Sequence, residues 1–138
     1  LQQASRFNLK SKDAYKKYIS KYFKVGLIIT ILIAMITFIF SEMIIYVFSR
    51  EKIDYSSKIL SILGFIPFLA MLNFKNVIYL LVNDLKSTLN KATFFTMIFM
   101  LLSSLILSSL YSGLGLAYAL VFTELVSFII HYYLINKR

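Results

Sequence analysis

The sequence contains no cysteine, and it has only one histidine, one proline, four glycines and six acidic residues. The lack of cysteine excludes a disulfide framework, a cysteine-based metal site and a cysteine nucleophile. One histidine cannot form a two-histidine metal site, and the scattered acidic residues form neither an Asp-x-Asp pair nor a His-Glu-x-x-His motif. No glycine-rich phosphate loop precedes a predicted helix. We therefore expect no enzyme activity, no metal and no cofactor in this chain.

Charged residues are scarce as well, at 15% of the chain, whereas soluble domains have about a quarter. The apolar residues form four blocks, at 25–48, 59–82, 92–111 and 114–135. Each block is long enough to cross a bilayer, which takes about 20 apolar residues in a helix. A soluble bundle would need a polar outer face, for which the blocks leave almost no residues. The sequence predicts an all-α polytopic membrane protein with four transmembrane helices at 25–138, preceded by a basic interfacial segment at 1–24.

The basic residues predict the orientation of these spans. Of 15 basic residues, seven lie in 1–24, two in 83–91 and two at the end of the chain, which places eleven on one side. Three lie in the first connection, on the other side, and Lys75 lies within a span. Because cytoplasmic loops carry the excess of Lys and Arg, both termini are predicted to be cytoplasmic. Lysines alternating with aromatic residues near residue 20 suit an anionic membrane surface, so no nucleic-acid partner is needed.

Polar residues of the second block share one sector of a helix about 120° wide. The candidates for lining a cavity there are Ser61, Lys75, Asn76 and Tyr79, and Asn73 is the one amide on the opposite side. Two interpretations of Lys75 remain open. Its long stem can reach the nearby interface, or its ammonium can contact an anion in a cavity.

The fourth block carries Glu124, Ser127 and His131 on one face, and these are further cavity-lining candidates. Glu124 and His131 are separated by about 10.5 Å along a helix axis and are not expected to touch. One interpretation is a hydrated path or a proton-sensitive carboxylate, and the other is a hydrogen bond between packed helices.

Two further features concern the backbone. Pro67 removes a backbone hydrogen bond and predicts a kink near the middle of the second span. The connection at 112–115 is so short that the last two spans must form an antiparallel hairpin, with Gly113 and Gly115 supplying the backbone freedom.

Three motifs in this order resemble the C-terminal region of bacterial polysaccharide flippases, which belong to the multidrug/oligosaccharidyl-lipid/polysaccharide exporter superfamily. The first is the end of a span at 41–48, after a basic stretch. The second is a tyrosine-led entry at 55–63, followed by Pro67 and Asn73. The third is a Gly-x-Gly-x-Ala opening at 113–117, followed by Glu124.

The resemblance implies a two-lobed inner-membrane bundle of roughly twelve to fourteen helices with a cationic cavity and ion-coupled alternating access. Its substrate would be an undecaprenyl-pyrophosphate-linked oligosaccharide for O-antigen, lipopolysaccharide or capsule, which is moved to the outer leaflet. Lys75 would fit such a cavity. Because the chain begins at Leu1 and four helices are too few for such a bundle, we expect a fragment that partners with the remaining helices, membrane lipids and the lipid-linked oligosaccharide.

Two alternatives stay open. One is a related drug or cation exporter, which would favour an acidic cavity. The other is a small four-helix accessory protein of glycan modification, which would be stable alone.

Overall fold

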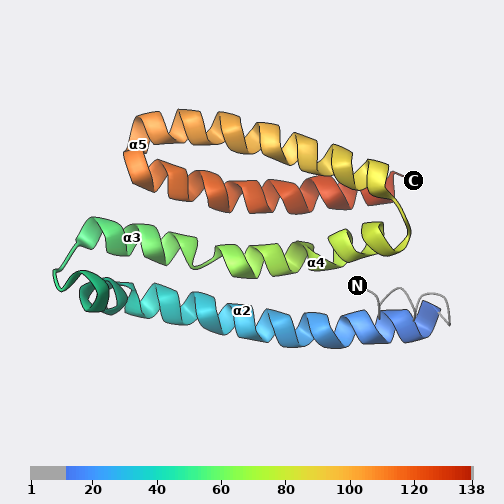
Figure 1. Ribbon diagram of the computed structural model, residues 1–138, viewed down its shortest axis with the longest axis horizontal. Coiled ribbons are helices and arrows are strands. Elements are labelled where there is room, and N and C mark those ends of the chain that lie inside the picture. Colours follow the sequence, from blue (N-terminus) through green and yellow to red (C-terminus); the bar gives the residue numbers. More distant parts are fainter. Residues whose placement is uncertain (1–11, 138) are drawn as a thin grey trace.

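A computed structural model describes the backbone of residues 12–137 and the side chains of residues 19–137. Its elements are α2 (Lys12–Ser49), α3 (Asp54–Leu63), α4 (Ile66–Val82) and α5 (Lys86–Asn136). The prediction of an all-helical chain is confirmed over this part of the sequence. The helices lie in layers, with α2 on one side, α3 and α4 end to end in the middle, and α5 folded back on itself on the other side (Figure 1). Both middle helices pack against α2 and against α5.

Helix α2 joins two regions that the sequence interpretation treats separately. It begins at Lys12 and continues without interruption to Ser49, so the described part of the basic segment 1–24 and the first span are one helix. Residues 1–11 lie outside the described residues. A continuous helix follows from the lack of proline or a glycine pair between these regions, since nothing in the local sequence ends the backbone hydrogen bonding.

The second predicted span is divided into α3 and α4. The break lies at Gly64 and Phe65, and Pro67 is placed in the first turn of α4, where a missing N–H is tolerated. Gly64 is buried, and a Cβ there would lie 2.8 Å from the side chain of Thr37 in α2. The end of α3 therefore depends on glycine for its close approach to α2.

Helix α5 reverses direction at Ser112, where φ is 53° and ψ is −132°. Its two arms, 86–111 and 113–136, lie side by side (Figure 1). The sequence predicts that Gly113 and Gly115 supply the backbone freedom for this turn, but neither glycine has a positive φ. Gly115 has a different role. A Cβ there would overlap the backbone carbonyl of Leu107, so glycine permits the contact between the arms.

A tyrosine from α3 stabilises this reversal. The hydroxyl of Tyr55 accepts a hydrogen bond from the backbone N–H of Leu114 at 3.2 Å and donates one to the carbonyl of Tyr111 at 3.5 Å. Ser112, between these two residues, has a backbone conformation that costs about 1–3 kcal/mol in a residue with a Cβ. The tyrosine thus bonds backbone groups that the turn leaves without helical partners.

Burial in this structure is the reverse of that in a soluble protein. The buried residues of α5 are small or polar, and Leu80 of α4 is the one large side chain that is fully buried among the described residues. Large apolar side chains instead cover the outer surface, as along α2 at Ile28, Leu32, Ile39 and Met43. Small residues allow close helix packing where lipid solvates the large ones. Three helical segments, 19–49, 54–82 and 86–136, are long and apolar enough to cross a membrane.

Candidate functional site

A buried polar cluster joins α4 to the second arm of α5. Asn73 Nδ2 donates to Ser127 Oγ at 2.9 Å, and His131 Nδ1 lies 2.7 Å from the carbonyl oxygen of Ser127. His131 Nδ1 also lies 3.4 Å from both Asn73 Nδ2 and Ser127 Oγ. The three residues are at most 8% exposed. A cluster of this kind in an apolar helix pair fixes the rotation of one helix against the other.

The cluster leaves two buried polar atoms without partners. A carbonyl oxygen can only accept, so His131 Nδ1 carries the proton that it donates to the Ser127 carbonyl. His131 Nε2 has no hydrogen-bond partner within the described residues, and neither has Asn73 Oδ1. A buried polar atom without a partner costs about 1–3 kcal/mol. These two atoms therefore offset part of the stability that the hydrogen bonds of the cluster contribute.

The three residues of the cluster line an open groove of about 550 Å³ between α4 and both arms of α5. We call it the acceptor groove. Its lining residues are Ala70, Asn73, Phe74, Val77, Leu89, Asn90, Thr93, Glu124, Ser127 and His131. This set contains one carboxylate, that of the half-buried Glu124, and no lysine or arginine. The groove lies toward the end of the molecule where α4 leads into α5 and where α5 ends (Figure 1).

Buried residues at every fourth position of the second arm of α5, most of them small, position the cluster. Buried residues recur along the second arm at Gly115, Ala119, Thr123, Ser127 and His131. Positions four apart lie on one face of a helix, so this arm presents a narrow ridge to its neighbours. The ridge begins with glycine and alanine and ends with two hydroxyl residues and a histidine, where the arm meets Asn73.

The structure brings together only part of the residue set that the sequence predicts. Glu124, Ser127 and His131 share the acceptor groove, whereas Lys75 is not among its lining residues. The exposed Lys75 side chain points toward α2, with Nζ 4.1 Å from the centre of the Phe23 ring. A cation over an aromatic ring at an exposed site is worth about 0.5–1 kcal/mol. The roles predicted for Lys75 remain predictions.

The other candidates of the second span are separated from one another. Asn76 is half-buried, with its Nδ2 unpartnered. Tyr79 is exposed, and its carbonyl accepts a hydrogen bond from Asn83 Nδ2 at 2.8 Å. Ser61 donates to the carbonyl of Lys58 and lies near the opposite end of the molecule.

A second hollow lies at the opposite end, between α2 and α3. It has a volume of about 350 Å³ and is lined by Phe38, Ser41, Glu42, Asp54, Ser57, Lys58 and Ser61. Two carboxylates and one ammonium line it, while the buried Ser57 donates to the carbonyl of Ile53. Its polar groups therefore have local partners or solvent, unlike those of the acceptor groove. The part of the chain that the structure describes contains no cluster of three metal-ligating side chains.

Asn73 is the residue that sequence reasoning missed. A helical projection correctly separates it from Lys75, because residues two apart point about 200° from each other. The projection treats the larger polar sector as the functional one, but the structure places the lone amide of the other side against α5. One feature of the sequence could have identified Asn73. A single amide on an otherwise apolar helix face is costly to bury unless it has a hydrogen-bond partner.

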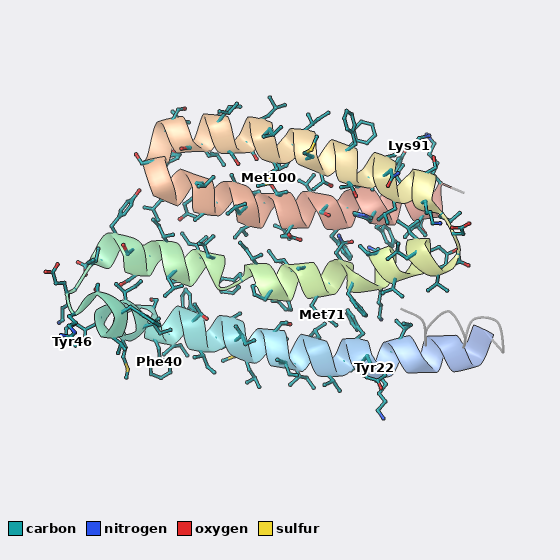
Figure 2. The ribbon with its side chains drawn as sticks, viewed as in Figure 1. Tyr22, Phe40, Tyr46, Met71, Lys91 and Met100 are labelled. Carbon is teal, nitrogen blue, oxygen red and sulfur yellow. The ribbon has the colours of Figure 1, made fainter. Side chains whose placement is uncertain are left out.

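A shallow hollow with one lysine lies beside the acceptor groove. Asn90 lines both the groove and this hollow, which is formed with Ser87, Lys91, Phe94 and Phe95. Lys91 is exposed near the start of α5 (Figure 2). Lys91 therefore lines the neighbouring hollow and not the groove itself.

One comparison with known proteins gives a match. The model of a family described as polysaccharide biosynthesis protein matches residues 5–138, which is nearly the whole chain. No curated protein and no solved structure matches the chain.

Proposed function

The chain belongs to the polysaccharide biosynthesis protein family, and we propose that it is the C-terminal part of a bacterial inner-membrane flippase for lipid-linked oligosaccharide. In this proposal it crosses the membrane four times, through α2, through α3 and α4 together, and through each arm of α5. Both termini are cytoplasmic, and the remaining helices complete a two-lobed bundle. The chain moves its substrate without chemical conversion. The transported oligosaccharides are used to build surface polysaccharides such as O-antigen or capsule.

The acceptor groove is the observation that carries this proposal. Helices that face lipid are expected to be apolar, and a polar group within them marks a path or a binding site. Here Asn73, Glu124 and His131 line one groove between apolar helices. Sugars need such hydrogen-bonding groups, and the family match supports a glycan as the substrate.

Lysines near the same end of the molecule would serve the pyrophosphate. Lys91 is exposed in the hollow next to the groove, and Lys75 is exposed on the α2 side of α4. An ammonium binds phosphate oxygens through charge-assisted hydrogen bonds. The excess of basic residues on this side of the spans supports a cytoplasmic location, which is where a lipid-linked substrate would be loaded.

The test is glycan translocation by the full-length protein in proteoliposomes. A fluorescent undecaprenyl-pyrophosphate oligosaccharide should become accessible to an added glycosidase on the far side only when the protein is present. Lys75→Ala should slow this about tenfold, which corresponds to the loss of about 1.4 kcal/mol. Lys52→Ala, in the connection at the opposite end, is the matched control and should transport normally. Normal translocation by Lys75→Ala at the same protein level would remove Lys75 from the mechanism.

A second candidate function is favoured by one observation. The groove contains a carboxylate and no lysine or arginine, as expected of a drug or cation exporter. Accumulation of cationic dyes in cells separates the two functions. Dye export without glycan translocation would replace the flippase proposal with this one.

A further inference from the structure

The hollow between α2 and α3 lies at the end of the molecule opposite the acceptor groove. Its charged lining residues are Glu42 from α2 and Asp54 and Lys58 from α3. We propose that this hollow binds the headgroup of phosphatidylethanolamine, a zwitterionic phospholipid, with the ammonium at the two carboxylates and the phosphate at the lysine. The inference rests on the part of the proposed function in which α2 and α3 cross the membrane, and not on the transported substrate.

The charges of the hollow are not neutralised by one another. Over the residues that the structure describes, the one ion pair joins Lys86 and Asp84 near the start of α5. Glu42, Asp54 and Lys58 are all exposed, and in the described structure none of them is paired with another. A ligand that carries both an ammonium and a phosphate can bind both kinds of charge at once.

Small side chains leave the space that a headgroup needs. Ser41 of α2 and Ser57 and Ser61 of α3 line the hollow, and each donates to a backbone carbonyl three or four residues earlier. Because these hydroxyls are bonded locally, the charged side chains are the groups that select the ligand. The volume of about 350 Å³ falls within the range of about 300–1,000 Å³ that is common for small-molecule sites.

The hollow lies where the helices reach the lipid headgroups. The last turns of α2, which ends at Ser49, and the first turns of α3, which begins at Asp54, form its walls. Tyr46 is exposed at the same end (Figure 2), and tyrosines are enriched where helices leave the hydrocarbon region. A lipid of the surrounding leaflet therefore reaches the hollow from the side, without entering the protein.

The surface changes from charged to apolar in the direction of the membrane centre. Phe38, one turn from Glu42 on α2, lines the hollow and is 58% exposed. Its ring contacts the ring of Phe65 edge to face, with the centroids 5.8 Å apart, and Phe65 lies at the joint between α3 and α4. Charged groups followed by aromatic rings match the order of headgroup and acyl chains in a phospholipid.

The carboxylates distinguish this lipid from the other common phospholipids. The ammonium of phosphatidylethanolamine has three N–H groups that can donate to Glu42 and Asp54, whereas the trimethylated nitrogen of phosphatidylcholine has none. Phosphatidylglycerol carries a net negative charge and no ammonium, so it would meet two like charges and one lysine. Rejection of a competitor by a repulsive group is a general route to specificity.

Native mass spectrometry of the full-length protein in detergent measures this preference, because it resolves each bound lipid. Dioleoyl phosphatidylethanolamine, its N-monomethyl derivative, phosphatidylcholine and phosphatidylglycerol are titrated separately. The first phosphatidylethanolamine should bind at least about tenfold more tightly than phosphatidylcholine or phosphatidylglycerol, which equals about 1.4 kcal/mol. The monomethyl lipid, which keeps two N–H groups, should bind with intermediate affinity.

Two variants test the contribution of the charges. Glu42→Gln combined with Asp54→Asn keeps the shape of the hollow and leaves Lys58 as its one charge, so phosphatidylglycerol should then bind at least as tightly as phosphatidylethanolamine. Glu51→Gln is the matched control, because Glu51 is an exposed carboxylate of the same connection that does not line the hollow. It should leave the order of the four lipids unchanged. An unchanged helical circular dichroism spectrum shows that each variant is folded.

Four outcomes would overturn the inference. They are equal binding of phosphatidylethanolamine and phosphatidylcholine, a preference that persists in the double variant, a preference lost in Glu51→Gln, and binding that a metal chelator abolishes. If any of these occurs while proteoliposomes still translocate lipid-linked glycan, only the lipid site fails and the flippase proposal stands. If the preference is found but translocation is absent, the flippase proposal fails and the lipid site remains.

Discussion

The two arms of α5 are both apolar, and they differ in one hydroxyl group that bonds another helix. In the first arm Thr96, Ser103 and Ser109 donate to carbonyls three or four residues back in the same helix. In the second arm Thr123 does the same with the carbonyl of Ala119, whereas Ser127 is bonded across to Asn73 of α4. The second arm lies between the first arm and the α3–α4 layer, whereas the first lies at the edge (Figure 1). The role of a Ser or Thr hydroxyl in helix packing can therefore be stated only when the helix that lies next to it is known.

The largest expected effect concerns the contact between the arms. Gly115→Leu would place a side chain where the Leu107 carbonyl lies, so it should reduce stability by about 3 kcal/mol or more. Thermal unfolding of the purified protein in nanodiscs measures this. Gly113→Ala is the control, since its Cβ meets only the flexible end of Ile59 at 3.1 Å and the Tyr55 hydroxyl at 3.3 Å. Equal losses in both variants would show that close approach at Gly115 is not the cause.

A smaller effect should separate cross-helix hydrogen bonds from local ones. Asn73→Leu removes the amide that bonds Ser127 and should cost about 1 kcal/mol, within the range for such bonds in membrane proteins. Thr96→Val in the first arm removes only a bond to its own helix and should cost less than about 0.5 kcal/mol. Unfolding in a denaturant series compares the two. A larger loss from Thr96→Val would contradict the distinction between the arms.

The smallest effect tests the turn that joins the arms. Tyr55→Phe removes a hydroxyl that bonds both sides of the reversal and should cost about 0.5–1 kcal/mol. Hydrogen exchange at the Leu114 amide should increase with it. Tyr46→Phe, at an exposed position near the same end of the molecule, should change neither quantity (Figure 2). Unchanged exchange in Tyr55→Phe would mean that the turn is held by its own backbone.

The sequence was sufficient to predict an all-helical chain and the place of the reversal, because hydropathy and loop length are local properties. It did not predict which face of α4 meets α5. Lys75 and Asn73 lie on opposite faces in both the projection and the structure, but the neighbour of each face depends on tertiary packing. The turn shows the same limit. Two glycines marked the place correctly, yet Ser112 adopts the positive φ, and Gly115 instead permits a contact eight residues back along the chain.

The interruption at Gly64 and Phe65 has a mechanical consequence. The second arm of α5 is bonded to α3 at one end, through Tyr55 and Leu114, and to α4 at the other, through Ser127 and Asn73. The second arm of α5 therefore holds both halves of the interrupted middle layer. A change in the angle between α3 and α4 would strain one or both of these hydrogen bonds, so the tyrosine and the amide together resist bending of that layer.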